Sequence, residues 1–290
     1  MSKIKLGSKE IFNSSKPYFI AEIGINHNGD IKNALELINA CRDAGADAVK
    51  FQKRTVDVVY SAEELAKPRD SVFGNTNGDL KRGLEFGRQE YDQINKLCKK
   101  INIDWFASCW DEESVDFFDV YDLPCYKLAS ASITDKNLLM RHKKKNKPII
   151  LSTGMSTENE IDKAIEVFDK ERLIILHCTS SYPCKLEELN LNVIKSLSEK
   201  YDCIIGYSGH EVGLSTTLAA YVLGARVLER HVTLDRSQWG SDQSASIEPQ
   251  GLKKLIRDIN TIYNSLGDGV KKVYDSEKPI IEKLRRKNTI

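Results

Sequence analysis

Hydrophobic runs and amphipathic segments alternate along almost the whole chain. The runs are short and apolar, as in YFIAEIG (residues 18–24), whereas the segments between them repeat apolar positions at helical spacing, as in DIKNALELINACRDAG (30–45). That first amphipathic segment opens with an Asp that can cap a helix and closes with a Gly that can end one. We interpret the runs as eight strands, at 18–24, 47–52, 104–109, 125–130, 147–153, 173–179, 203–207 and 225–232.

Each predicted strand is followed by a predicted helix. The helices are expected at 30–45, 89–101, 111–121, 135–145, 157–168, 186–200, 212–223 and 249–267. Strict alternation of this kind demands a parallel sheet with right-handed crossovers. Eight units in about 250 residues match the α/β fold known as the eight-stranded parallel (β/α)8 TIM barrel. An open doubly wound sheet is the alternative, but it normally carries a Gly-rich phosphate turn after its first strand, and GINHNG (24–29) lacks that pattern.

The barrel is predicted to occupy residues 1–267 as a catalytic domain. Within it, residues 53–86 are too polar and too rich in Gly to be core, so they are expected to be irregular. No domain boundary is visible before residue 268, and 268–290 is expected to be a charged C-terminal arm.

Composition narrows the classes of function. The chain has 290 residues, of which 41% are hydrophobic and 29% charged, as in ordinary globular proteins, and its net charge of +1 argues against nucleic acid or membrane as a partner. No stretch is apolar enough for a signal peptide or a membrane span. The seven Cys form no CxxC pair, and an odd number in apolar runs suggests reduced thiols and a cytoplasmic location.

Polar residues cluster where the predicted strands end, which is where a TIM barrel carries its active site. Lys50 and Lys127 lie in otherwise apolar strands, and a buried ammonium without a partner is costly. A single such Lys could equally pack its aliphatic chain along the core so that its ammonium group reaches water. Two of them beside several serines suggest a cradle for phosphate and carboxylate, and thus lyase or transferase chemistry on a small anion. The polar residues at these strand ends are Glu22, Lys50, Lys127, Ser130, Ser152, Ser180, Tyr182, Ser208 and His210.

Two histidines suggest a divalent-metal site. His210 lies just after the seventh strand and His231 near the end of the eighth, and consecutive parallel strands end at the same edge. Asp242 follows on the next loop, in WGSDQ. Two imidazoles with an acid nearby can hold a metal and leave coordination positions open. The alternative is that each His merely makes hydrogen bonds at the rim.

Motifs at nearly every strand end resemble the sialic acid synthase family, also called N-acetylneuraminate synthases. The likeness covers about residues 17–285. The motifs are FIAEIGINHNGD, DAVKFQ, YKLAS, ILSTGM, HCTSSYP, GYSGHE, LERHVTLD and GSDQSASIEP.

The resemblance implies a specific reaction. Members of this family condense phosphoenolpyruvate with an aldose, usually N-acetylmannosamine or its 6-phosphate, to give a 3-deoxy-2-keto sugar acid and phosphate. By this likeness His210 and His231 would hold Mn²⁺, Mg²⁺ or Co²⁺, which would polarise the aldehyde. Tyr182 and Asp242 would meet the sugar, and Glu22 would be the acid near the reacting centre. The residues expected to hold phosphoenolpyruvate are Lys50, Lys127, Ser130, Ser152 and Ser208, with Ser180 alongside.

Three departures from the family pattern affect the acceptor rather than the donor. Ser132 replaces an acid, Gln243 replaces a His, and the chain stops where the family's antifreeze-like domain should begin. A separate protein could supply that domain. The hypothesis favoured by the three changes together is a different acceptor, so that the enzyme is a ulosonate synthase acting on a non-acylated or phosphorylated aldose. A homo-oligomer, dimer or tetramer, is expected.

Two further functions stay open at this level. One is a non-catalytic barrel that binds a sugar acid, although the donor and metal sets are complete. The other is a metal-dependent aldolase that uses pyruvate.

Overall fold

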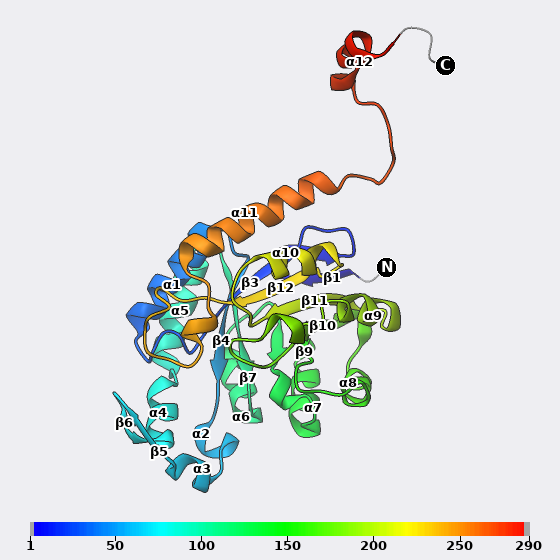
Figure 1. Ribbon diagram of the computed structural model, residues 1–290. Coiled ribbons are helices and arrows are strands. Elements are labelled where there is room, and N and C mark those ends of the chain that lie inside the picture. Colours follow the sequence, from blue (N-terminus) through cyan, green and yellow to red (C-terminus); the bar gives the residue numbers. More distant parts are fainter. Residues whose placement is uncertain (1–2, 287–290) are drawn as a thin grey trace.

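All eight predicted strands form, and they close into one parallel barrel (Figure 1). The computed structural model describes residues 3–286. Closure occurs where the last strand pairs with the first, with Val227 beside Tyr18 and His231 beside Glu22. The TIM-barrel prediction is therefore confirmed. The strands are β3 (Tyr18–Gly24), β4 (Ala48–Lys53), β7 (Asp104–Cys109), β8 (Tyr126–Leu128), β9 (Ile149–Ser152), β10 (Leu173–Cys178), β11 (Ile204–Gly209) and β12 (Val227–His231).

Helices surround the barrel and begin and end as their capping residues dictate. Asp30 accepts a hydrogen bond from the backbone N–H of Lys32, and Gly45 ends the first helix in the left-handed conformation. The expected helix at 186–200 is shorter, because Asn190 has a positive φ that a helix cannot contain. The helices that follow the eight strands are α1 (Ile31–Ala44), α5 (Arg88–Ile101), α6 (Glu112–Phe117), α7 (Lys136–Lys144), α8 (Glu158–Ile165), α9 (Val193–Lys200), α10 (Ser215–Val222) and α11 (Pro249–Leu266).

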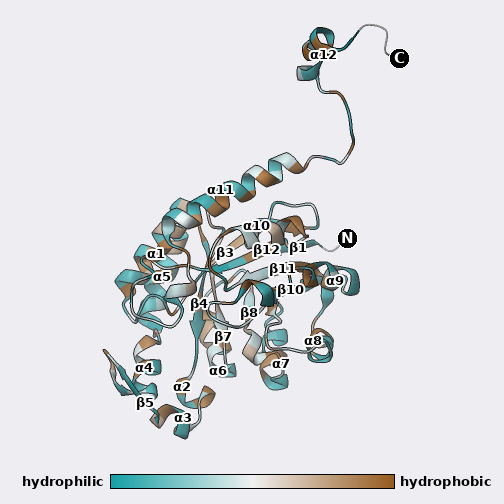
Figure 2. Ribbon diagram, in the orientation of Figure 1, coloured by the Kyte–Doolittle hydropathy of each residue, from teal (hydrophilic) through white to brown (hydrophobic). Residues whose placement is uncertain are grey.

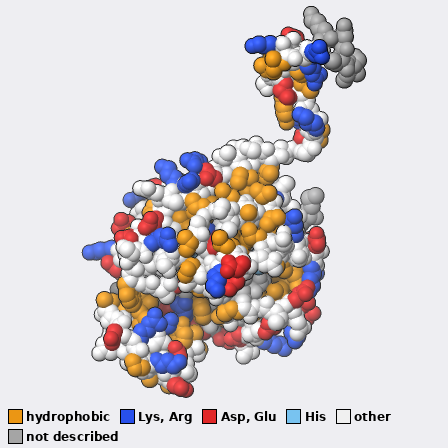
Figure 3. Space-filling view, in the orientation of Figure 1, with side chains coloured by type: hydrophobic (Ala, Val, Ile, Leu, Met, Phe, Trp, Pro, Cys, Tyr) orange, Lys and Arg blue, Asp and Glu red, His pale blue; other side chains and the backbone are white. Residues whose placement is uncertain are grey.

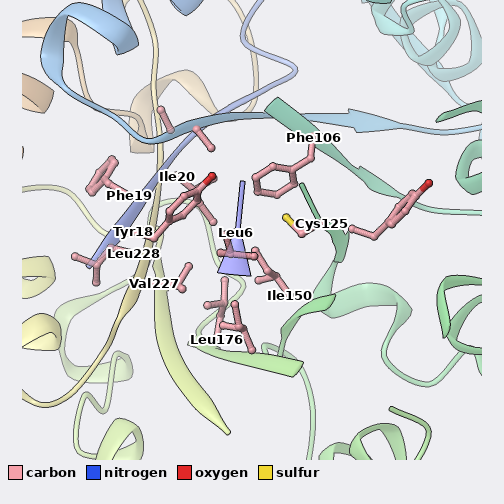
Figure 4. Packing of buried hydrophobic residues seen from close by; sticks show 14 of the residues in the cluster. Leu6, Tyr18, Phe19, Ile20, Phe106, Cys125, Ile150, Leu176, Val227 and Leu228 are labelled. Carbon is pink, nitrogen blue, oxygen red and sulfur yellow. The ribbon is translucent and has the colours of Figure 1, made fainter. Parts of the chain in front are cut away.

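A hairpin that was not predicted closes the amino end of the barrel. It consists of β1 (Lys3–Leu6) and β2 (Lys9–Phe12), and it buries Leu6 completely. Figure 4 shows Leu6 among side chains from several barrel strands, including Ile20, Phe106 and Val227. The turn at Gly7 packs against Asp104, the first residue of β7. The hairpin thus fills the amino end of the barrel interior with apolar side chains such as Leu6.

The stretch after β4 is folded, so the expectation of an irregular segment was wrong. It contains α2 (Val56–Val59), α3 (Ala62–Ala66), the two-stranded sheet β5 (Pro68–Ser71) and β6 (Gly74–Thr76), and α4 (Asn77–Leu84). We call residues 54–86 the α2–α4 excursion; it projects from the barrel near the carboxyl end of β4 (Figure 1). Phe73 anchors it, because its ring lies 6.5 Å from the ring of Trp239 on the loop after β12.

The C-terminal part of the chain leaves the barrel. The first half of α11 buries Leu252, Leu255, Ile256 and Ile259, and hydrophobic and hydrophilic bands alternate along this helix (Figure 2). Beyond it the chain runs outward to the short helix α12 (Lys278–Leu284) (Figure 1). The last four residues of the predicted arm, 287–290, lie outside the described residues.

None of the helices within residues 3–286 has the length and apolar character that crossing a bilayer requires. All seven cysteines are buried and free.

Candidate active site

Polar side chains line the open end of the barrel because strand geometry turns them inward together. Residues two apart on a strand face the same side, so β4 turns both Lys50 and Gln52 into the barrel. In the same way β12 turns both Glu229 and His231 into the barrel. Glu229 lies below the rim and His231 lies at the rim. These side chains surround a cavity of about 180 Å³ at the carboxyl ends of the strands, which we call the central cavity.

Ten of the eleven predicted site residues line the central cavity. The exception is Asp242, which stands behind His231 with its Oδ2 atom 3.6 Å from His231 Nδ1. The ten are Glu22, Lys50, Lys127, Ser130, Ser152, Ser180, Tyr182, Ser208, His210 and His231.

Four buried charges form the floor of the central cavity. Lys50 Nζ lies 3.0 Å from Glu22 Oε2 and 3.6 Å from Glu229 Oε1, and it donates a hydrogen bond of 2.9 Å to the Ser108 hydroxyl. Lys127 Nζ also lies 3.6 Å from Glu229 Oε1. We call these two lysines and two glutamates the floor network. Their side chains are at most 4% exposed, so each ammonium finds its countercharge inside the protein.

The floor network shifts the pKa values of its two glutamates in opposite directions. Burial raises the pKa of Glu22 to about 7, although Lys50 acts in the opposite direction. Burial also acts to raise the pKa of Glu229, but the charges of Lys127 and Lys50 outweigh it and lower that pKa to about 2. Glu229 is therefore a fixed negative charge near neutral pH, whereas Glu22 can exist with or without its proton.

Two hydroxyl groups extend the floor network. Lys127 donates a hydrogen bond of 2.6 Å to the Ser152 hydroxyl, and Ser208 donates one of 3.1 Å to Glu229 Oε1. Glu229 Oε2 makes no hydrogen bond with any described residue, although it is buried. A buried carboxylate oxygen of this kind can accept a hydrogen bond or ligate a cation.

A second group of small polar atoms lies on the β8–β10 side. The backbone N–H of Gly154 donates to the Ser130 hydroxyl at 3.0 Å and to Cys178 Sγ at 3.1 Å. A Cβ atom at position 154 would come within 2.2 Å of the Ser180 hydroxyl, so only glycine allows these loops to converge. The result is a cradle of hydroxyl groups beside Lys127 that suits a phosphate or carboxylate.

The two histidines lie together at the rim, as their positions after successive strands predicted. Their ring centroids are 5.5 Å apart, and the ring of Tyr182 lies 4.2 Å from that of His210. Burial, with the charge of His231, lowers the pKa of His210 to about 4, and burial lowers that of His231 as well. Both imidazoles are thus neutral near pH 7, which is the form that ligates a metal.

The histidine pair fits a divalent cation. His210 Nδ1 hydrogen bonds to the carbonyl oxygen of Thr179 at 2.7 Å, which fixes the ring and leaves Nε2 available. His231 Nδ1 is buried and makes no hydrogen bond with any residue in 3–286, and Asp242 Oδ2 lies 3.6 Å from it. Within residues 3–286, no three His, Cys, Asp or Glu side chains converge into a complete metal cage. A metal held by this pair would therefore keep positions for water or substrate.

Several residues of the central cavity were missed by the sequence interpretation. Glu229, Gln52 and Ser108 line it, together with Trp110 and Cys178. The signal was available for two of them, because Glu229 is two residues before His231 and Gln52 two residues after Lys50.

Neither residue that suggested an altered acceptor lines the central cavity. Gln243 is 1% exposed and braces the loop after β12: its side-chain oxygen accepts a hydrogen bond from Thr233, and its amide reaches the Asn26 carbonyl at 3.4 Å. Ser132 is buried in the turn after β8. The argument that both substitutions face the acceptor is therefore not supported by their positions.

A second buried ion pair connects the two histidine strands from outside the barrel. Arg230 and Glu211, each next in sequence to one of the histidines, have side chains with no exposed surface and a contact of 2.9 Å. Arg230 also donates to Thr217 on α10 at 2.7 Å, and Tyr207 donates to Glu211 at 2.9 Å. This pair fixes the loop that carries His210 against the strand that carries His231.

A family model, related sequences and a solved structure all match this chain, and the three matches agree with one another. The model of the NeuB family matches residues 37–271. The human N-acetylneuraminate-9-phosphate synthase is 36% identical over 92% of this chain and 76% of its own length, and the N,N'-diacetyllegionaminic acid synthase of Campylobacter jejuni is 38% identical over 93% and 84%. The crystal structure of N-acetylneuraminic acid synthetase from Leptospira borgpetersenii, solved with citrate, superposes with a TM-score of 0.86 at 33% identity and covers 99% of both chains.

The Arg230–Glu211 pair yields a stability prediction. Arg230→Met leaves Glu211 as an unpaired buried charge, which should lower the free energy of unfolding by about 3–5 kcal/mol. Urea denaturation of Arg230→Met, Glu211→Gln and the double variant measures the coupling. We expect the free energy of unfolding of the double variant to fall clearly less than the sum of the decreases in the two single variants.

Lys200→Met is the matched control, because Lys200 pairs with Glu158 at the surface, and its unfolding midpoint should hardly move. Strict additivity of the two single variants would contradict the structural role given to the pair.

Proposed function

Because this chain belongs to the NeuB family, we propose that it condenses phosphoenolpyruvate with an aldose to form a 3-deoxy-2-keto sugar acid of the sialic acid type and phosphate. The observation that carries the proposal is the floor network next to the histidine pair. It brings two ammonium groups, a hydroxyl cradle and a carboxylate that can exchange a proton to one small cavity.

The donor is assigned to the floor of the central cavity. Phosphoenolpyruvate carries a carboxylate and a phosphate, and Lys50 and Lys127 supply charge-assisted contacts to such groups. Ser130, Ser152, Ser180 and Ser208 add hydroxyl donors around them. These contacts orient the enol so that its C3 carbon faces the open end, where the acceptor enters.

Glu22 is assigned to the chemistry at C2 of the donor. A new bond between donor C3 and the aldehyde carbon leaves cationic character at C2, which a neighbouring carboxylate stabilises. Water then adds at C2, the bond to the phosphate oxygen breaks, and a ketone remains. With a pKa of about 7, Glu22 can take one proton from the water and pass it to the oxygen of the former aldehyde, which becomes a hydroxyl group, while the second proton of the water leaves with the phosphate.

The acceptor is assigned to the rim. His210 and His231 would hold the divalent ion, preferably Mn²⁺, Mg²⁺ or Co²⁺. When bound, that ion supplies a Lewis acid for the aldehyde oxygen. Tyr182, whose ring packs on His210, and Asp242, behind His231, would position the hydroxyl groups of the sugar.

The two competing functions, an aldolase and a non-catalytic binding protein, would each need fewer features in the central cavity. An aldolase that uses pyruvate has no phosphate to bind, so it does not need the hydroxyl cradle beside Lys127. A barrel that only binds a sugar acid does not need an acid whose pKa lies near 7. Both features favour the condensation.

The first test is release of inorganic phosphate from phosphoenolpyruvate. We expect release that depends on the sugar, with N-acetylmannosamine, mannose, arabinose and their phosphates offered in parallel with Mn²⁺. The keto acid product is identified by mass spectrometry. Turnover with pyruvate in place of phosphoenolpyruvate would indicate the aldolase, and binding without turnover of either donor would indicate the binding protein.

The second prediction concerns the metal. A chelator should abolish activity, and Mn²⁺, Mg²⁺ or Co²⁺ should restore it. His210→Gln should be inactive but fold normally, because the side chain lies at the rim and not in the packed interior. His142→Gln is the control: His142 is a buried residue of α7 that does not line the central cavity, and the folded variant should retain its activity. Full activity in excess chelator would refute the metal assignment.

The third prediction concerns the donor lysines. Lys50→Met and Lys127→Met should each lower kcat/KM for phosphoenolpyruvate by roughly 30- to 150-fold, since a charge-assisted contact to a desolvated anion contributes about 2–3 kcal/mol. Steady-state kinetics measure the loss, and circular dichroism checks the fold.

The control for both lysines is Lys143→Met, an exposed residue near the end of α7. It should leave kcat/KM unchanged. Equal effects of all three substitutions would show that the lysines of the floor network do not hold the donor.

A further inference from the structure

A second cavity, of about 260 Å³, lies between the α2–α4 excursion and the loop after β12. We call it the side cavity. Its polar lining consists of Asn28, Arg69, Lys81, Trp239, Gly240 and Ser241, and leucine and isoleucine side chains complete its wall. The next residue after Ser241 is Asp242, which stands behind His231 of the central cavity. The loop after β12 therefore connects the wall of the side cavity to the histidine pair of the central cavity.

The side cavity is positively charged, and its charges are not paired. Lys81 and Arg69 are its titratable residues, and within residues 3–286 no carboxylate lies within ion-pair distance of either. Lys81 Nζ lies 5.2 Å from the centre of the Tyr60 ring, which is a cation–π contact. Lys and Arg side chains gather over the excursion on the face drawn in Figure 3.

Neighbouring cations of the excursion are paired. Lys67 contacts Glu64, Arg82 contacts Asp57 at 2.5 Å, and Arg54 contacts Glu85 at 3.3 Å. Lys81 and Arg69, which face the side cavity, have no carboxylate at such close range among residues 3–286, and Glu64 and Asp242 act on Lys81 only from a greater distance.

Like charges converge on Lys81. Burial, followed by the charges of Arg54 and Arg69, lowers the pKa of the Lys81 ammonium. The charge of Asp242 acts in the opposite direction, so this one carboxylate influences both His231 and Lys81. Cations held together in a half-buried cavity are unfavourable by themselves, and an anion bound between them removes the repulsion.

We propose that the side cavity binds the phosphate group of a phosphorylated aldose whose aldehyde end lies at the histidine pair. The proposal rests on the proposed function, because it names the class of acceptor used by that site. A phosphate suits two cations of different shape: Arg69 offers a fork of N–H donors and Lys81 a point charge. The Asn28 amide adds an uncharged donor.

The test compares each acceptor with its own phosphate. The pairs are N-acetylmannosamine, mannose and arabinose, each against its terminal phosphate, with saturating phosphoenolpyruvate and Mn²⁺. We expect kcat/KM to favour the phosphorylated member by at least about tenfold. Lys81→Met should lower kcat/KM for the phosphorylated member by about 30-fold and narrow the ratio, and Lys81→Arg should recover most of the loss. Arg69→Ala should also lower kcat/KM for the phosphorylated member.

Arg82→Met is the matched control, because Arg82 is the neighbour of Lys81 in sequence but pairs with Asp57. This variant should leave the ratio of kcat/KM for the phosphorylated aldose to kcat/KM for the unphosphorylated aldose unchanged. A ratio near one in the wild type, or equal losses on both members of a pair in Lys81→Met, overturns the proposal.

A binding measurement separates this proposal from the proposed function. Calorimetry without phosphoenolpyruvate titrates the protein with mannose 6-phosphate, mannose and inorganic phosphate. Binding of the sugar phosphate that is lost in Lys81→Met supports the side cavity even if no condensation occurs. Turnover of neutral sugars with no binding of sugar phosphate overturns the side cavity and leaves the proposed function in place.

Discussion

The floor network is the constraint on which the rest of the site depends. Two ammonium groups and two carboxylates lie in a barrel interior whose neighbouring layers are apolar, and each charge is tolerable only because the others are present. Removal of any one member leaves an uncompensated charge, so the four positions act as a unit. The same arrangement sets the chemistry, since it keeps Glu229 ionised and places the pKa of Glu22 near neutrality.

The barrel supplies the register that the floor network needs. Glu22 pairs laterally with Lys50 on one side and His231 on the other, and Ser208 pairs with Glu229. A slip of one residue in any of these strands would turn its polar residue outward and an apolar one into the cavity. The β1–β2 hairpin covers the opposite end of the barrel with side chains such as Leu6.

The sequence predicted what depends on short-range periodicity. The strands, most of the helices and the positions of ten site residues follow from apolar runs and from the rule that parallel strands end together. It did not predict what depends on distant contacts. The β1–β2 hairpin is two strands of four residues, which are stable only because the barrel offers Leu6 a surface to cover. The spacing of two between Glu229 and His231 could have placed Glu229 in the cavity, but its pairing with Lys127 joins two strands far apart in the chain and has no local signal.

The α2–α4 excursion shows why the acceptor side is harder to infer than the donor side. Of the residues assigned to the donor, Lys50, Lys127, Ser152 and Ser208 lie on strands, whose geometry is fixed by the barrel, whereas the side cavity forms where the excursion meets the loop after β12. That meeting depends on Phe73 against Trp239, two residues far apart in sequence whose contact no local pattern indicates. Gln243 braces the same loop through Thr233 and Asn26. Under the proposed assignment, donor binding would rest on the strands of the barrel, and acceptor recognition on loop segments that can change without disturbing the floor network.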